Sequence, residues 1–276
     1  MRGFYLNKQI IGFVGTGNMA ESMIRGLTAT ELESRELWAT DIDNPRLAYI
    51  AECYGVVPKS LEAIAKGTDI IILSVKPQNI ELVLTNLANH LNRYEQLIIS
   101  IAAGVTTSQI ESYSGTSLSV VRCMPNTPAM VGFGATGLFA NKQVSTSQRQ
   151  EADSILRTLG INVWVDNESK IDVITAISGS GPAYFFLLIE ALQDIAIDLG
   201  LDEDLSKILV NQTAIGAGHL AQTEVNDITG LRKRVTSPGG TTEAAIQVFE
   251  SGGFRKLVKD AAMAAHKKSV KIAEKN

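Results

Sequence analysis

The sequence predicts an α/β protein whose N-terminal part forms a doubly wound sheet and whose C-terminal part is all helical. Short apolar segments alternate with longer amphipathic segments from residue 9 to about residue 166. Two of the short segments, Ile70–Leu73 and Leu97–Ile99, are apolar at every position, which is typical of strands buried on both faces. Beyond residue 166, apolar residues recur at helical spacing without a strand pattern. Strands that alternate with helices favour a parallel sheet covered on both sides.

Six strands joined by helices are expected in the first region. The predicted strands are Gln9–Val14, Glu36–Asp41, Asp69–Val75, Gln96–Ile101, Leu118–Met124 and Asn162–Asp166. Helical periodicity is clear in Asn18–Leu27, Arg46–Tyr54 and Ser147–Leu159. The pattern predicts a Rossmann-like first domain over residues 1–166 and a helical second domain over residues 167–276.

The segment Ala183–Leu199 in the second region predicts a helix that is apolar around most of its circumference. Pro182 suits the first turn of this helix, and Gly200 is expected to end it. A helix that is apolar nearly all round must be buried on nearly all sides. Residues 167–276 are too few to supply that cover, so we expect a second copy of the chain to pack on this region in a homo-oligomer.

The composition of the 276-residue chain excludes several classes of protein. Apolar residues make up 45% and charged residues 20%, which is ordinary for a globular protein, and the net charge of -4 argues against nucleic acid as a partner. No uninterrupted apolar run reaches the roughly 18 to 20 residues that a membrane helix needs. Met1–Lys8 lacks the apolar stretch of a signal peptide, and two cysteines are too few for a disulfide framework. We therefore expect a cytoplasmic protein without a metal site.

A glycine-rich motif follows the first predicted strand. Gly15, Gly17 and Ala20 form the pattern G-x-G-x-x-A between a strand and a helix. The first glycine permits a tight turn, the second lets backbone approach a pyrophosphate, and the alanine allows close packing of helix on strand. The N–H groups at the start of the helix favour an anion. This context predicts a dinucleotide site.

The end of the second strand bears on the choice between NAD and NADP. Asp41 stands where a carboxylate accepts hydrogen bonds from the adenosine ribose, and it would repel a 2′-phosphate. Arg46 follows closely and can compensate for that charge, and Asp41 also suits the N-cap of the next turn. The choice of cofactor therefore stays open at this point.

Two later strands also end in residues that suit a ligand. Lys76, which follows the strand ending at Val75, is either a contact to cofactor or substrate or a solvated loop lysine. Asn126 lies between Pro125 and Pro128, which stiffen its loop into a surface suited to a nicotinamide ring. Both strands are expected to end at the ligand-binding edge of the sheet.

A second candidate site lies in the helical region, where Val235–Glu243 precedes a helical pattern. The small residues Gly239 and Gly240 allow backbone N–H groups to converge on a carboxylate or phosphate. Thr241 and Thr242 place hydroxyls at the edge of this anion site. The same residues also suit an unusual helix cap. The segment Ser178–Pro182 is either another capping turn or a second wall of the pocket.

These segments together resemble the 1-pyrroline-5-carboxylate reductase family along the whole chain. The resemblance rests on I-G-F-V-G-T-G-N-M-A, S-V-K-P, R-C-M-P-N-T-P-A, S-G-S-G-P-A-Y and above all V-T-S-P-G-G-T-T-E-A-A-I. It implies a Rossmann domain followed by an all-α C-terminal dimerisation domain, with dimers that often assemble into decamers. Many members carry a small polar residue or Asn-Arg where Asp41-Ile42 stands here.

The resemblance also implies a role for each matching residue. The implied cofactor-binding residues are Gly15, Thr16, Gly17, Asn18, Met19, Ser74, Lys76, Pro77 and Asn126. Asp41 is added to them from its place after the second strand, not from the resemblance. The implied substrate-binding residues are Ser237, Gly239 and Gly240, to which the loop pattern adds Thr241. Thr242 is the implied catalytic residue, which would hydrogen-bond the ring nitrogen. The expected reaction is hydride transfer from NADPH or NADH to the cyclic imine, giving L-proline. The alternatives are a non-catalytic NAD(P)-sensing protein and an oxidoreductase like the 3-hydroxyacid dehydrogenases.

Overall fold

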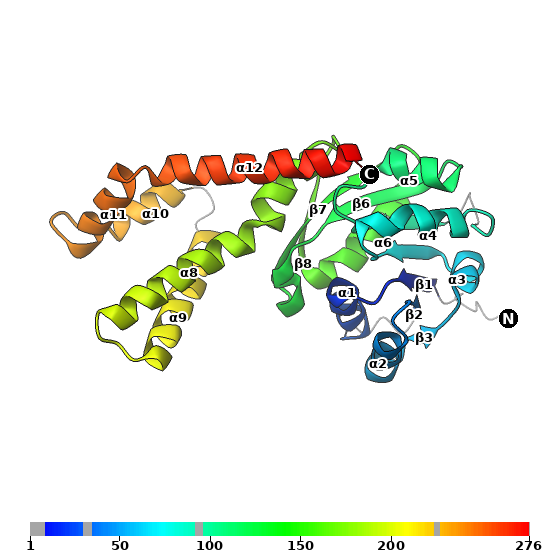
Figure 1. Cartoon of the computed structure of the whole chain (residues 1–276), viewed down its shortest axis with the longest axis horizontal. Coiled ribbons are helices and arrows are strands. Elements are labelled where there is room, and N and C mark those ends of the chain that lie inside the picture. The colour runs from blue at the N-terminus through cyan, green and yellow to red at the C-terminus, as the bar shows by residue number, and fades with distance from the viewer. Residues whose placement is uncertain (1–8, 30–34, 92–95, 224–226, 276) are drawn as a thin grey trace, which may run out of the picture. The chain divides into compact units, whose positions relative to one another are not determined.

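The computed structural model describes residues 9–29, 35–91, 96–223 and 227–275 (Figure 1). The expectation about Met1–Lys8 lies outside these residues. The chain divides into two compact units. The first unit contains the residues up to Ser180 together with those from Ala265 onward, and the second contains Gly181–Ala264.

An eight-stranded sheet forms the centre of the first unit, in the order β3-β2-β1-β4-β5-β6-β7-β8. The strands are β1 Gln9–Val14, β2 Arg35–Thr40, β3 Val57–Pro58, β4 Ile70–Leu73, β5 Leu97–Ser100, β6 Ser119–Met124, β7 Gly134–Ala140 and β8 Gly160–Trp164. Every pair is parallel except β6 with β7. The six predicted strands are present, and two strands were not predicted, the two-residue β3 and the antiparallel β7.

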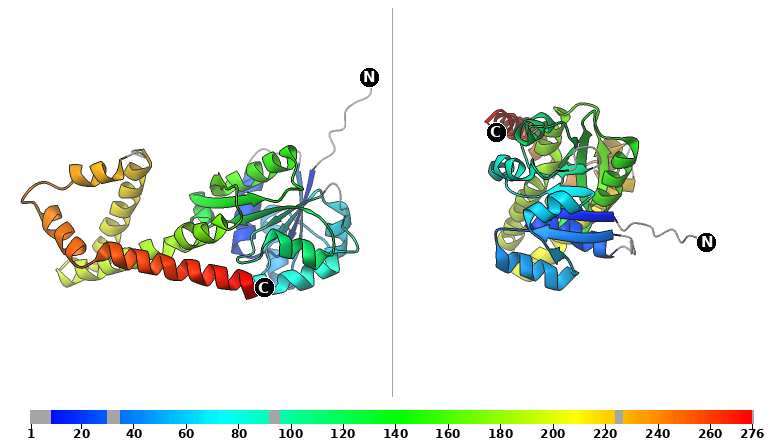
Figure 2. Two further views of the ribbon diagram at one scale, coloured as in Figure 1. Left: turned by 90° about the horizontal axis from the view of Figure 1, so that it is seen from above. Right: turned by 90° about the vertical axis from the view of Figure 1, so that its right-hand side faces the viewer.

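Helices cover both faces of this sheet, as a doubly wound fold requires (Figure 2). They are α1 Asn18–Ala29, α2 Asn44–Tyr54, α3 Leu61–Gly67, α4 Ile80–Leu87, α5 Thr107–Ser114, α6 Thr146–Leu156 and α7 Lys170–Ile174. Short 3₁₀ turns, η1 Pro77–Asn79, η2 Thr127–Val131 and η3 Arg157–Leu159, and the π-helical turn η4 Thr175–Gly179 join them. Alternate strand residues point to opposite faces: Ile72 joins the apolar cluster that contains α1, and Ile71 joins the cluster that contains α3 and α4.

The second unit consists of helices in its described residues. They are α8 Gly181–Asp198, α9 Glu203–Thr223, α10 Ile228–Arg234, α11 Thr241–Ser251 and α12 Phe254–Lys275, whose last residues belong to the first unit. Pro182 lies in the first turn of α8, and Gly200, with a φ of 102°, follows the end of that helix. The helix begins and ends where the sequence predicts.

The first unit extends beyond the boundary expected after residue 166. The buried guanidinium of Arg122 pairs with Glu168 at 3.2 Å and with Asp172 at 3.4 Å. Ser269, near the end of α12, donates a hydrogen bond to the same Asp172 oxygen at 2.8 Å. These contacts join the segment leading up to Ser180 and the C-terminal end of the chain to the sheet.

The helical stretch Lys170–Asp198, which contains α7, η4 and α8, qualifies the expectation that no segment is long and apolar enough to cross a membrane. It contains 29 residues, and by length and composition alone it is long and apolar enough to cross a membrane. The prediction counted uninterrupted apolar residues, whereas this stretch has a few polar side chains among its apolar ones. Core helices of soluble proteins can have the same length and composition, so one such helix is weak evidence for a membrane span.

Candidate functional site

The glycine-rich motif forms the turn between β1 and α1 in the first unit. Gly15 has a φ of 96°, and a Cβ there would meet the Ser74 carbonyl oxygen at 2.8 Å, so only glycine fits. Gly17 differs, because a Cβ built on it meets nothing within 4 Å. Gly17 and Asn18 are exposed at the start of α1, followed by the half-buried Met19. The turn is therefore packed on the strand side and open where a pyrophosphate would approach.

Thr16, the central residue of this turn, is fully buried and its polar atoms are all bound within the protein. Its N–H and its hydroxyl both donate to Oδ2 of Asp41, at 2.6 and 2.7 Å. Its carbonyl oxygen accepts from Nε of Arg46 at 2.9 Å. Thr16 therefore shapes the turn, while the exposed Gly17 and Asn18 present the donors that face solvent.

Asp41 lies directly after β2 and its carboxylate is held by three donors. Besides the two from Thr16, its Oδ1 accepts from the Asp43 N–H at 3.0 Å. Burial raises the pKa of Asp41, but the hydrogen bonds from Asp43 and Thr16 outweigh that effect and leave the pKa below its ordinary value. The side chain is a fixed, ionised carboxylate at neutral pH.

Arg46, expected as a possible counter-charge, is bound on several sides. Besides the bond to Thr16, a terminal nitrogen of its guanidinium pairs with Glu21, and the guanidinium lies 5.3 Å from the centre of the Tyr49 ring. The hydrogen bond from Arg46 lowers the pKa of Glu21, and Tyr54 donates to the same carboxylate at 2.8 Å. Arg46 thus braces the glycine-rich turn against α1 and α2.

A hollow of about 270 Å³ lies at the carboxyl ends of β1, β2 and β4. Its lining residues are Val14, Gly15, Thr40, Asp41, Ile42, Leu61, Val75, Asn79, Leu82 and Val83. Most of this wall is apolar, and the one charge among these residues is the Asp41 carboxylate. A hollow of this size and polarity, beside the glycine-rich turn, suits the adenosine half of a dinucleotide.

Residues at the end of β4 complete this edge of the sheet. The Ser74 hydroxyl lies within 3.0 Å of the carbonyl oxygen of Val14 and 2.7 Å of that of Gly15, and it donates to them. Lys76 is exposed and precedes the 3₁₀ turn that begins at Pro77. Ser74 therefore ties β4 to the glycine-rich turn, whereas the Lys76 side chain faces solvent.

Asn126, which follows β6, connects three segments of the first unit. Its amide nitrogen donates to the carbonyl oxygen of Ser178 at 3.1 Å and to the hydroxyl of Ser178 at 3.3 Å. Its amide oxygen accepts from the Ala135 N–H at 2.9 Å. The sequence marked Ser178 as part of a capping turn or a pocket wall, but it gave no sign of this contact. Cys123 nearby is buried, which raises the pKa of its thiol and disfavours a nucleophilic role.

The second candidate site lies in the second unit, between α10 and α11. Gly239 has a φ of 71°, and the Gly240 N–H donates to the carbonyl oxygen of Ser237 at 3.0 Å. The Gly239 N–H donates to a carboxylate oxygen of Glu243 at 2.7 Å. Thr241 and Thr242 are exposed in the first turn of α11, and the Gly240 cap makes no side-chain hydrogen bond. The loop therefore presents a helix N-terminus with hydroxyls, and one of its N–H groups already binds a carboxylate.

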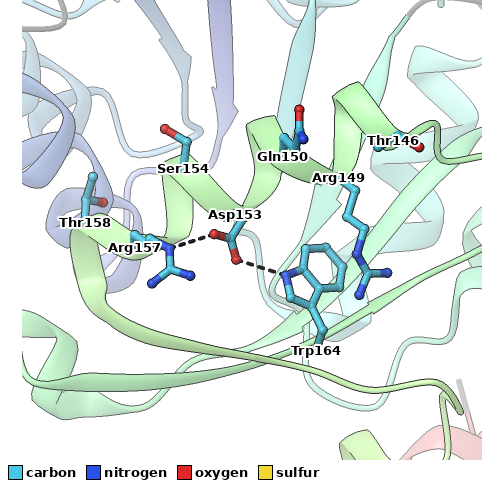
Figure 3. Close-up of a pocket in the computed structure, with 8 residues that line it drawn as sticks. All are labelled: Thr146, Arg149, Gln150, Asp153, Ser154, Arg157, Thr158 and Trp164. Carbon is cyan, nitrogen blue, oxygen red and sulfur yellow. Dashed lines mark hydrogen bonds and ion pairs between the residues drawn. The ribbon is translucent and has the colours of Figure 1, made fainter.

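A hollow of about 820 Å³ between α6 and β8 contains none of the predicted site residues (Figure 3). Asp153 accepts from the indole N–H of Trp164 at 2.9 Å and from Nε of Arg157 at 2.7 Å. The Arg149 guanidinium lies 3.8 Å from the centre of the Trp164 ring. These contacts brace the edge strand β8 against α6.

The first unit has the defining parts of a dinucleotide-dependent oxidoreductase: a doubly wound sheet, an open glycine-rich turn at a helix N-terminus and an apolar hollow bounded by an acidic residue. Among the residues that the structure describes, no three His, Cys, Asp or Glu side chains are grouped to hold a metal ion. The class alone does not specify a substrate.

Comparisons with known proteins give the family. Residues 168–272 match the family described as "Pyrroline-5-carboxylate reductase dimerisation", and residues 10–104 match "NADP oxidoreductase coenzyme F420-dependent". The chain is 46% identical to the pyrroline-5-carboxylate reductase of Pseudomonas aeruginosa over 96% of its own length and 97% of that protein. The chain belongs to the pyrroline-5-carboxylate reductase family, as the motifs in its sequence predicted.

Two solved structures agree with this assignment. A pyrroline-5-carboxylate reductase from Coxiella burnetii superposes with a TM-score of 0.90 at 41% identity, covering 97% of this chain and 99% of that one. The Plasmodium falciparum pyrroline carboxylate reductase with NADP bound gives a TM-score of 0.83 at 31% identity, with the same coverage. The predicted α/β class, with a dinucleotide-binding sheet and a helical dimerisation region, is confirmed.

Proposed function

We propose that this chain reduces 1-pyrroline-5-carboxylate to L-proline by hydride transfer from NADH or NADPH. The observation that carries the proposal is the relationship to pyrroline-5-carboxylate reductases over nearly the whole chain, at up to 46% identity among the proteins described above. Both parts that such a reaction needs are present: an open pyrophosphate turn in the first unit and a threonine-bearing anion loop in the second.

The residues around the glycine-rich turn fit a nicotinamide dinucleotide, because the open space at Gly17 admits a pyrophosphate and the adjoining hollow admits adenosine. When bound, the cofactor supplies the hydride. Gly15, Thr16, Gly17, Asn18 and Met19 form the pyrophosphate turn, and Asp41 accepts from the adenosine ribose. Ser74, Lys76 and Pro77 border the cofactor, and Asn126 fixes the loop proposed to face the nicotinamide.

The loop of the second unit binds the substrate in this proposal. Ser237, Gly239, Gly240 and Thr241 hold the ring carboxylate, and the affinity of this loop for a carboxylate is supported by the bond between the Gly239 N–H and Glu243. Thr242 hydrogen-bonds the ring nitrogen and orients the imine carbon toward the hydride donor. If the imine binds in its protonated form, hydride addition neutralises the iminium and no side-chain acid has to donate a proton. The contribution of these residues is binding and orientation.

The two alternative functions have less support. Dehydrogenases of the 3-hydroxyacid type place a lysine on the helix after the small-residue turn, whereas α8 contains none. A non-catalytic sensor would bind the dinucleotide without oxidising it in the presence of the imine. The chain's relatives are reductases by description, which favours catalysis.

We further propose that the protein acts in the cytoplasm as a homodimer, or as a decamer built from five such dimers, without nucleic-acid or membrane partners. The match to a dimerisation family covers the second unit. It accounts for the apolar surface of α8 by contact with another copy of the chain rather than with lipid.

The test is a cofactor-oxidation assay with 1-pyrroline-5-carboxylate and each reduced cofactor, with L-proline identified as product. We expect turnover, and we expect Gly17→Val to abolish it because the added side chain occupies the space left for the pyrophosphate. Ser147→Val, at an exposed position in the first turn of α6, is the matched control and should retain full activity. Dinucleotide binding without proline formation would favour the sensor instead.

A further inference from the structure

The hollow beside the glycine-rich turn contains features that bear on which dinucleotide it accepts. Its charged lining group is the Asp41 carboxylate, which lies at the carboxyl end of β2 where the adenosine ribose of a bound dinucleotide is placed. The remaining wall near this carboxylate is formed by apolar side chains, including Leu61, Val75 and Leu82. An anionic 2′-phosphate entering here would meet a like charge and a surface that offers it few donors.

The Asp41 carboxylate has little freedom to turn away from such a phosphate. Its Oδ2 is fixed by the N–H and hydroxyl of Thr16, and its Oδ1 by the N–H of Asp43. Moving it would break the bonds that shape the pyrophosphate turn itself. Both oxygens keep a further lone pair, so the carboxylate can still accept from a ribose hydroxyl.

The cation nearest in sequence, Arg46, is already committed. Its Nε donates to the Thr16 carbonyl oxygen and a terminal nitrogen pairs with Glu21. Lys59, the next cation along the chain, lies over the Trp38 ring at 4.7 Å. Lys76 follows Val75, but it is not among the residues that line the hollow. A phosphate on the ribose would have to draw Arg46 away from two partners.

We propose that Asp41 makes this enzyme select NADH over NADPH, with Arg46 serving to position the glycine-rich turn rather than to bind a 2′-phosphate. The proposal rests on the reductase function proposed above. It separates this chain from the Plasmodium falciparum relative, whose structure has NADP bound, and from what the description of the matching N-terminal family suggests. The physical basis of the selection is the repulsion between the Asp41 carboxylate, which lies beside the adenosine ribose, and the 2′-phosphate of NADPH.

The decisive experiment measures kcat/KM for NADH and NADPH, and the dissociation constants of NAD⁺ and NADP⁺, for the wild-type protein and for Asp41→Asn. Wild type should favour the non-phosphorylated cofactor by roughly tenfold or more in both measurements. Asp41→Asn keeps an oxygen that accepts from Thr16 but removes the charge, so the NADPH:NADH ratio should rise about tenfold. The binding constants test the proposal even if the protein shows no turnover, in which case the proposed function fails while the selection can still stand.

Asp43→Asn is the matched control, because it removes the same charge two residues away, outside the hollow, and asparagine still serves as the N-cap of α2. Its cofactor ratio should equal that of wild type. A wild-type preference for NADPH would overturn the proposal, as would an Asp41→Asn variant in which both cofactors weaken equally. If Asp41→Asn does not fold, Asp41→Ser and the wild-type ratio decide the question.

Discussion

The two units of this chain bury their apolar residues to very different extents. In the first unit, Ile71, Ile72 and Ile98 are completely buried between the sheet and its helices. In the second, Phe185 and Leu187 on α8 are 68% and 67% exposed, and Val248 on α11 is 71% exposed. The first unit therefore completes its own core, whereas the second leaves its core-like residues to be covered by another copy.

The largest expected effect concerns the residues that extend the first unit beyond the predicted boundary. Arg122→Ala should lower the free energy of unfolding by about 3–5 kcal/mol, because it leaves the buried Asp172 carboxylate without its cation. Both tryptophans, Trp38 and Trp164, belong to the first unit, so their fluorescence during urea unfolding reports on it. Arg157→Ala, which removes an exposed ion pair, is the control and should cost less than about 1 kcal/mol. Equal costs would show that the Arg122 cluster does not stabilise the unit.

The next prediction tests whether a second copy covers α8. Phe185→Asp places a charge in the proposed interface and should weaken self-association by more than about 2 kcal/mol, roughly a 30-fold rise in the dissociation constant. Light scattering after size-exclusion chromatography measures the mass of the assembly. Val131→Asp, at a 72% exposed position in the first unit, should leave that mass unchanged. If only the Val131 variant dissociated, the interface would have to be assigned to the first unit.

A smaller effect, on kcat/KM, is expected from replacing Thr242. This substitution should separate substrate binding by the second unit from dinucleotide binding by the first. Thr242→Ala should reduce kcat/KM by about 5- to 150-fold, equivalent to about 1–3 kcal/mol, through loss of a hydrogen bond to the ring nitrogen. The dissociation constant for the dinucleotide should not change, because the glycine-rich turn lies in the first unit. Thr146→Ala, on α6, is the control for loss of an exposed threonine. A weaker affinity for the dinucleotide in Thr242→Ala would contradict this division of roles.

The sequence predicted more of the first unit's strands than of its site contacts, because strands follow from local apolar patterns whereas the contacts join residues far apart along the chain. Runs such as Ile70–Leu73 predict buried strands because every residue of the run requires burial. The strand β7 was missed because two of its glycines resemble turn residues. Both are required by distant neighbours: a Cβ on Gly134 would meet the Leu159 carbonyl oxygen at 2.6 Å, and one on Gly137 would meet Ile174 at 2.5 Å.

In the candidate site, too, contacts between residues far apart in the sequence could not be predicted from local patterns. The glycine motif and the acidic residue after β2 were recognised from local order along the chain, and the structure brings them together. The bonds from Thr16 to Asp41 and from Asn126 to Ser178 join residues 25 and 52 positions apart. No local pattern encodes such pairs, so the sequence predicted which residues matter but not which of their polar atoms are already bound.

The smallest expected effect is the pH dependence that Asp41 gives to the first unit. Its pKa is lowered in the folded protein from an ordinary value of 3.8, because the bonds from Asp43 and Thr16 outweigh the effect of burial. The unfolded state therefore binds more protons near that pH, and the stabilisation is complete above 3.8 and lost as the pH falls through the lower folded pKa. Urea unfolding followed by tryptophan fluorescence from pH 5 downward should show a steeper loss of stability for wild type than for Asp41→Asn. Equal slopes would mean that the carboxylate is no better held in the folded protein than in the unfolded chain, and the fixed charge that the first unit presents to a dinucleotide would lose its basis.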